Sequence, residues 1–388
     1  MAEHSLIFPA QEYRTRTARL QEGMVAQGLA ALLLTSPADI FYTTGFLTRF
    51  WESPARPWFV IVPNAGDPVA VIPSIGADLM GRTWLRDIRT WDAPNPRDDG
   101  ISLLTETLAT VVAPQGQIGL PMGLETHLRM PLQNFETLRV QLAPRRFVDA
   151  TACVQRVREV KSEAEIDKIR TACTVAARAF ARVPEFAHAG QPLAEVFRDF
   201  QITLLAEGAD WVSYVAGAAG PDGYGDVISP ADQQPLQRGD ILMLDTGAVK
   251  CGYFCDFDRN FAVGPASDTA RCAHAALWQA TEDAWAELRP GMLARDVHNL
   301  LCEGLQKRGE TPTVGRFGHG LGLTLTEWPS FTPLDETPLH AGMVLTLEPG
   351  CVTWDGRIMV HEENFVLHDD GPELLSPRAP EDLPEIIT

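Results

Sequence analysis

The stretch LDTGAVKCGYFCDFDR, residues 244–259, places acidic residues in strand patterns that are otherwise apolar. Asp245 follows the apolar run ILML, and Asp256 comes eleven residues later in YFCDFDR, after a turn signal around KCG. A carboxylate on a half-buried strand is costly unless it is paired, neutralised or coordinated. These two aspartates therefore indicate a functional site, provided that other residues of suitable chemistry join them.

Three such residues follow in the second half of the chain. His319 lies among glycines in GRFGHGLGLTLTEWPS (315–330), Glu348 ends VLTLE, and Glu362 lies in MVHEENFVL. The glycines around His319 indicate either a turn that happens to contain a histidine or space for something to approach the imidazole. Four carboxylates and one imidazole suit hard or borderline divalent cations, and four negative charges match two ions. Because two-metal sites lower the pKa of a bridging water, we expect a dinuclear hydrolase.

Length and composition narrow the class of protein. The chain has 388 residues, 45% of them apolar, which is long for one core and suits two domains. A formal charge of −19 argues against nucleic acid and anionic membrane surfaces as partners. We find no signal-peptide pattern and no apolar run of membrane-spanning length. The seven scattered cysteines favour a reduced, cytoplasmic protein.

The first part of the chain reads as an α/β unit. An amphipathic helix is expected to end at Gly28, and the short strands AALLLT (30–35), WFVIVP (58–63) and PVAVIP (68–73) follow it. Near residue 150 the pattern changes. We place the domain boundary at about 150–160, which gives domains 1–155 and 156–388.

The second part is expected to be an α+β domain with helices packed on a mainly antiparallel sheet. Ser162 and Glu165 form the pattern of a capping box at the start of a helix. Further helices are expected at about 192–207, 267–287 and 293–308. The strands that we expect are DILMLDTG (240–247), GYFCDFDRNFAV (252–263), MVLTLEPG (343–350) and HEENFVLH (361–368).

Five motifs together resemble the pita-bread metallopeptidase family, which includes prolidase, aminopeptidase P, methionine aminopeptidase and creatinase. They are the opening stretch, GHGLGL (318–323), LTLEPG (345–350), VHEEN (360–364) and VREVKSEAEI (157–166). The first part of the chain also resembles the creatinase/prolidase amino-terminal domain. The resemblance implies an α/β two-domain fold: this amino-terminal domain, followed by an α+β pita-bread catalytic domain.

The same resemblance implies the roles of individual residues. It makes Glu348 the group that handles the proton of the bridging water, and it implies a homodimer. It also implies two divalent ions per subunit, with manganese first and iron, cobalt or zinc left open. The metal ligands carried over are Asp245, Asp256, His319, Glu348 and Glu362.

The residues that hold the peptide in family peptidases are replaced here. Two histidines of the family pattern fall on Ile228 and Thr326, seventeen residues before Asp245 and seven after His319. Because such imidazoles orient the scissile group, we expect a substrate other than a standard Xaa-Pro peptide. Asp258 stands where the family usually has threonine, as a support for the metal site or as a solvated side chain.

The segment FYTTGFLTRFWESPARPWFVIV (41–62) resembles the part of creatinase that reaches into the active site of the partner subunit. Arg56 would clamp a carboxylate there, and Trp58 would offer an aromatic face to a cation. The alternative is that Trp58 belongs to the core and Arg56 to a surface ion pair. The first reading requires a homodimer.

We therefore expect a metal-dependent hydrolase of a peptide or amide C–N bond, similar to Xaa-Pro dipeptidases and aminopeptidases. The expected substrate is a short peptide or a small zwitterionic or proline-containing molecule. A creatinase-like amidinohydrolase and a metal-dependent lyase are alternatives among non-peptidase members of the family, and the lyase would belong to another enzyme class. Gly247 argues against the lyase, which carries a further aspartate in its first motif. A non-catalytic binding module is the remaining alternative.

Overall fold

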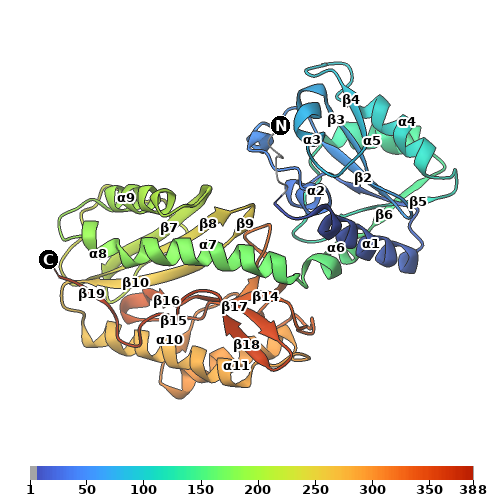
Figure 1. Cartoon of the computed structure of the whole chain (residues 1–388). Helices are drawn as coiled ribbons and strands as arrows, with labels where there is room; N and C mark the ends of the chain where they lie inside the picture. The colour runs from blue at the N-terminus through green and yellow to red at the C-terminus, as the bar shows by residue number, and fades with distance from the viewer. Residues whose placement is uncertain (1–6, 388) are drawn as a thin grey trace. The chain divides into compact units, whose positions relative to one another are not determined.

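The computed structural model describes residues 7–387 of the chain. The chain divides into two compact units, Met1–Arg158 and Glu159–Thr388, whose elements are labelled in Figure 1. No helix in the described range is both long and apolar enough to cross a membrane.

The first unit is built on one mixed sheet in the strand order β4-β3-β2-β1-β5-β6. Its strands are β1 Ala31–Leu34, β2 Phe59–Pro63, β3 Val69–Pro73, β4 Asp87–Trp91, β5 Gln117–Leu120 and β6 Arg146–Asp149. Its helices are α1 Ala10–Gln27, α2 Pro37–Thr44, α3 Ala77–Met80, α4 Ile101–Val111, α5 Leu132–Gln141 and α6 Thr151–Arg158, with 3-10 turns η1 Phe50–Glu52 and η2 Ser74–Gly76.

This unit matches the expected α/β pattern. The apolar runs predicted as strands are β1, β2 and β3, and their side chains are almost entirely buried. Helix α1 ends at Gly28, whose φ of 68° is left-handed, as a helix-terminating glycine allows. The core forms where α4 and α5 cover the apolar side chains of the central strands.

The second unit contains most of the strands of the chain. These are β7 Trp211–Pro221, β8 Asp240–Lys250, β9 Tyr253–Phe254, β10 Phe257–Val263, β11 Thr311–Pro312, β12 His319–Gly320, β13 Glu327–Ser330, β14 Val344–Leu347, β15 Gly350–Val352, β16 Ile358–Val360, β17 Glu363–His368, β18 Gly371–Leu374 and β19 Glu385–Ile386. Its helices are α7 Glu163–Ala181, α8 Val183–Phe186, α9 Leu193–Ala206, α10 Asp268–Glu287 and α11 Ala294–Lys307, with the 3-10 turn η3 Trp354–Gly356.

The helices begin and end where the sequence predicts. Ser162 accepts the N–H of Glu165, and the Glu165 side chain accepts the N–H of Ser162, so the capping box at the start of α7 is confirmed. Helices α9, α10 and α11 lie within one or two residues of the expected ranges. Apolar faces of α10 and α11 pack together against β8, β14 and β17 in the main core.

The expectation of one mainly antiparallel sheet needs a correction, because the strands form three sheets. One has the order β19-β10-β8-β7 with β9 beside β8, a second is β11-β15-β16, and the third is β13-β12-β14-β17-β18. All their pairings are antiparallel except the short one between β10 and β19. The division matters for the site, because its residues come from different sheets.

Candidate metal centre

The five predicted metal ligands occupy strands and strand ends of the second unit. Asp245 lies inside β8, which continues to Lys250, while Asp256 lies between β9 and β10. His319 opens β12, Glu348 follows β14 directly, and Glu362 lies between β16 and β17. The ligands therefore come from segments that are far apart in sequence.

The structure brings all five side chains into one linked cluster. Ligand atoms of Asp256, His319 and Glu362 lie within 4.8 Å of one another. Nε2 of His319 lies 3.2 Å from Oδ2 of Asp256 and 3.3 Å from Oε2 of Glu348. Asp245 joins them through the Tyr214 hydroxyl, which lies 3.0 Å from Oδ1 of Asp245 and 2.5 Å from Oδ1 of Asp256.

Local hydrogen bonds orient the imidazole of His319. Its Nδ1 lies 2.7 Å from the carbonyl oxygen of Gly320, which can only accept, so Nδ1 carries the proton. Its backbone N–H donates to Oγ1 of Thr346 at 3.1 Å, and that hydroxyl donates to Oε2 of Glu348 at 3.2 Å. Nε2 therefore faces the carboxylates and is the nitrogen that would bind a metal ion after losing its proton, the usual arrangement for a metal-binding histidine.

The glycines beside His319 serve the packing of strands. A Cβ on Gly318, whose φ is 141°, would lie 2.2 Å from the carbonyl oxygen of Thr346. A Cβ on Gly320 would lie 2.1 Å from the carbonyl oxygen of Trp328. Both glycines are needed because neighbouring backbone approaches closely on either side of the histidine.

Burial and mutual repulsion perturb the carboxyl groups. Burial first, and then the neighbouring acids, raise the pKa values of Asp245 and Glu362 well above the ordinary range. The pKa of Asp256 is also raised by burial, against the opposing effect of His319. Burial alone would raise the pKa of Glu348, but its hydrogen bond to His319 and the histidine charge bring it below the ordinary value. Burial would lower the pKa of His319, yet hydrogen bonds to Asp256 and Glu348 raise it to about 10.

These observations fit bound cations. Oε1 of Glu362 is buried and has no hydrogen-bond partner among the described residues, although a buried carboxylate oxygen requires one. The acids around it repel one another in a water-poor site, and positive charge among them would relieve that repulsion. Carboxylate oxygens and one imidazole nitrogen are ligands that divalent ions accept.

Comparison with known proteins gives the family. The model of metallopeptidase family M24 matches residues 167–370, and that of the creatinase/prolidase N-terminal domain matches residues 16–160. The chain belongs to metallopeptidase family M24. This M24 chain is therefore a metallohydrolase, and enzymes of its family use divalent metal ions.

Individual relatives agree with that assignment over the full length of the M24 chain. It is 30% identical to a probable dipeptidase PepE of Mycobacterium bovis over 372 residues, 94% of each chain. The crystal structure of dipeptidase PepE from Mycobacterium ulcerans matches with a TM-score of 0.84 and 27% identity, covering 98% of this chain and 99% of that one. A prolidase from Thermococcus sibiricus shares the fold, with a TM-score of 0.85, 23% identity and coverage of 96% and 99%. The predicted fold class is confirmed.

Two predicted substrate-binding positions lie in the second unit of the M24 chain. The side chain of Ile228 is 84% exposed, in the segment between β7 and β8. Thr326 is half-buried in the loop between β12 and β13, where its carbonyl oxygen accepts from Oγ1 of Thr324 at 2.9 Å. Neither position supplies an imidazole, and their contact with a substrate stays a prediction.

The other two positions lie in the first unit. Trp58 is 3% exposed and packs against Phe46 and Trp51, with ring centroids 5.0 and 5.7 Å away. This packing accounts for Trp58 without a ligand. The guanidinium of Arg56 lies over the ring of Phe50, 5.5 Å from its centroid, and its Nε has no hydrogen-bond partner among the described residues. The substrate roles of both residues stay predictions.

The structure adds Tyr214, which the sequence did not single out, and decides between the alternatives for Asp258. Tyr214 links two of the predicted ligands, Asp245 and Asp256, but in WVSYVAG it resembles any aromatic residue of a strand. Asp258 is 3% exposed, so the alternative of a solvated side chain is wrong. Burial raises the pKa of Asp258 to about 8. The sequence had marked Asp258 only as an aspartate at a position where the family usually has threonine.

Proposed function

We propose that this chain hydrolyses a C–N bond of a short peptide or small amide, using two divalent ions. The ligands would be Asp245, Asp256, His319, Glu348 and Glu362. The observation that carries this proposal is the grouping of Asp256, His319 and Glu362, with Glu348 beside His319 and Asp245 linked to Asp256 through Tyr214. One oxygen of Glu362 lacks a partner in the described part of the chain. Membership of family M24 supports it.

Bound ions would polarise the scissile carbonyl group and lower the pKa of an attacking water. Glu348 is the best-placed residue to accept and return the proton. Its side chain is 26% exposed, whereas those of His319 and Asp256 are 2% and 6% exposed, so it can exchange protons with substrate and solvent. Thr346 and His319 hold its Oε2 on one side, which fixes the orientation of the carboxyl group.

The replacement of two histidines by Ile228 and Thr326 favours a substrate other than a standard Xaa-Pro dipeptide. An isoleucine cannot donate a hydrogen bond or share a proton, so charge developing on the scissile group needs another partner. The names of the relatives, probable dipeptidase and Xaa-Pro dipeptidase, support a substrate of dipeptide size. We infer a small zwitterionic or proline-containing compound, with manganese as the first metal to test.

The test uses purified full-length protein, analysed for metal content and stripped with a chelator. Stripped protein and protein reloaded with manganese, iron, cobalt or zinc are offered dipeptides, small amides and betaine-like compounds. Products gaining the mass of water on reloading support hydrolysis. Products of elimination would indicate a lyase, and a failure to bind metal would indicate a binding module. Rapid cleavage of many Xaa-Pro dipeptides would contradict the inferred substrate class.

We also propose a cytoplasmic homodimer in which residues 1–155 form the amino-terminal domain and residues 156–388 the catalytic domain. The free thiols of all seven cysteines support a reducing compartment. The unpartnered Nε of Arg56, judged within the described residues, supports its use as a carboxylate clamp in the dimer. Arg56→Ala should raise KM for a substrate with a carboxylate end and leave KM for its amide unchanged. Equal KM values for wild type and variant would show that Arg56 does not bind the substrate carboxylate.

A further inference from the structure

Two of the proposed metal ligands are carried by strands of different sheets. Asp256 immediately precedes β10, which pairs with β8 and β19. Glu362 immediately precedes β17, which pairs with β14 and β18. No backbone ladder joins β10 to β17 in the described structure, so other contacts must set the spacing of the two carboxylates.

One side chain from β17 binds the backbone of Asp256. Oδ1 of Asn364 accepts the N–H of Asp256 at 2.9 Å, and Nδ2 of Asn364 donates to its carbonyl oxygen. Asn364 is fully buried, and its own N–H donates to Oγ of Ser376 at 3.0 Å. Asn364 therefore holds both backbone polar groups of the proposed ligand Asp256, and it lies two positions after the proposed ligand Glu362.

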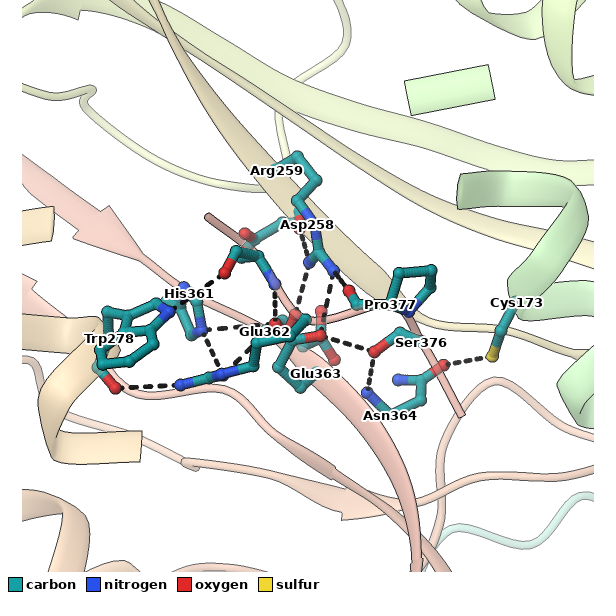
Figure 2. A network of polar contacts seen from close by, with 12 residues as sticks. Cys173, Asp258, Arg259, Trp278, His361, Glu362, Glu363, Asn364, Ser376 and Pro377 are labelled. Carbon is teal, nitrogen blue, oxygen red and sulfur yellow. Dashed lines mark hydrogen bonds and ion pairs between the residues drawn. The ribbon is translucent and has the colours of Figure 1, made fainter. Parts of the chain in front are cut away.

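A side chain from β10 binds the backbone of Glu362 in return, as Figure 2 shows. Nη1 of Arg259 donates to the carbonyl oxygen of Glu362 at 2.8 Å, and Nη2 donates to Oε2 of Glu363 at 3.0 Å. The carbonyl group of the second ligand is thus held from the strand that follows the first.

The buried carboxylate of Glu363 holds the side chain of Arg259 in place. It is fully buried and accepts from Oγ of Ser376 at 2.6 Å and from the N–H of Ala379 at 2.7 Å, in addition to Arg259. Glu362 and Glu363 are adjacent, so strand alternation directs Glu362 to the metal-ligand cluster and Glu363 to this network. Arg259 therefore has a fixed carboxylate on one side and a ligand backbone on the other.

We propose that Asn364 and Arg259 are positioning residues that fix the separation of Asp256 and Glu362. Asn364 does so by binding the backbone of Asp256, and Arg259 by binding the backbone of Glu362. The proposal rests on the proposed metal site. Ligands that repel one another in the absence of cations need such restraint to stay at coordinating distance. The bidentate amide and the planar guanidinium each restrain orientation as well as distance.

The first test is Arg259→Lys, with Arg308→Lys as the matched control. Lysine keeps the charge but cannot span the backbone and carboxylate acceptors together. Arg308 likewise binds a carboxylate, that of Asp283 at 2.8 Å, and a backbone carbonyl group, that of Gly304 at 2.7 Å. These partners belong to α10 and α11, which carry none of the proposed ligands. The readouts are calorimetric Mn²⁺ titration, the visible absorption spectrum of the Co²⁺ form and the unfolding midpoint of the metal-free protein.

We expect Arg259→Lys to weaken Mn²⁺ binding by about 10- to 100-fold and to alter the Co²⁺ bands, the usual effect of losing a support for a ligand. Arg308→Lys should lower the unfolding midpoint by less, because its ion pair is 27% and 39% exposed, and should leave both metal readouts unchanged. Unchanged metal readouts in Arg259→Lys, or equal changes in both variants, would overturn the proposal. A wild type that binds no metal would instead overturn the proposed function.

The second test is Asn364→Leu, with Gln191→Leu as its control. Gln191 is also buried and donates through its amide, to Asp199 at 3.0 Å, without contact to a proposed ligand. Weakened Mn²⁺ binding in Asn364→Leu alone supports the proposal, and equal binding in both variants overturns it. If Asn364→Leu does not fold, Asn364→Ser replaces it, because a hydroxyl group can satisfy only one backbone group of Asp256 well. Its Mn²⁺ affinity is then judged by the same two outcomes.

Discussion

Removing the ammonium group of Lys161 should destabilise the catalytic unit more than any surface ion-pair substitution. Nζ of Lys161 lies 3.0 Å from Oε2 of Glu327, and the two side chains are 2% and 4% exposed. Oε1 of Glu327 accepts from the N–H groups of Leu323 at 2.9 Å and Thr324 at 3.2 Å. The pair therefore ties the start of α7 to the loop that follows His319.

The magnitude follows from burial. Lys161→Met removes the ammonium group that lies 3.0 Å from the buried Glu327 carboxylate, and breaking a buried ion pair costs about 3–5 kcal/mol. Arg170→Met is the control, because Arg170 and Glu373 also form an ion pair in this unit but are 39% and 46% exposed. Solvent screens that pair, and its loss should cost at most about 1 kcal/mol.

The assay is urea unfolding of the metal-free protein at pH 7, followed by circular dichroism and tryptophan fluorescence. The double variant Lys161→Met, Glu327→Gln should recover much of the loss, because it removes both charges of the pair and keeps an acceptor for the loop N–H groups. A loss for Lys161→Met no larger than that for Arg170→Met would refute the reasoning. So would a double variant less stable than Lys161→Met.

Three further predictions concern protons, a hydroxyl group and thiols. Because the pKa of His319 is raised to about 10, metal must displace its proton, so Mn²⁺ affinity should rise as pH increases from 6 to 8, by about tenfold per unit for each proton released. Calorimetry in buffers of different ionisation enthalpy checks this, and binding without proton release contradicts it. Tyr214→Phe removes the donor shared by Asp245 and Asp256 and should weaken Mn²⁺ binding on the order of tenfold, as titration would show; unchanged affinity would count against that role. A thiol reagent should modify exposed Cys272 in native protein but not buried Cys173, whose pKa burial raises; mass spectrometry of modified peptides decides, and early labelling of Cys173 would contradict the structure.

Much of the fold could be predicted from the sequence, because the signals involved are local. A capping box at Ser162 and Glu165 acts within one helical turn, and apolar runs such as residues 58–63 report their own burial. The proposed metal ligands could be found for a related reason. Acids in apolar strand patterns and a glycine-flanked histidine are chemically unusual, so each marks its position without knowledge of its neighbours.

Residues with ordinary chemistry needed the tertiary structure. Tyr214 is a common residue type in strands and Asn364 carries no charge, and nothing near them in the chain indicates the aspartates that they bind. From the sequence, Gly318 and Gly320 could mark either a turn or space around the imidazole, and the structure shows that backbone carbonyls of Thr346 and Trp328 approach them. The pattern of apolar and polar residues likewise could not show that the strands of the second unit form three sheets.

The sequence by itself determined the helices and strands with strong local signals and the residue types of the proposed site, since propensity, capping and charge belong to single residues and their near neighbours. The tertiary structure alone decided which groups hold those ligands in place. Asn364 lies 108 positions from Asp256 and Arg259 lies 103 positions from Glu362, and hydrogen bonds over such separations exist only after the chain has folded.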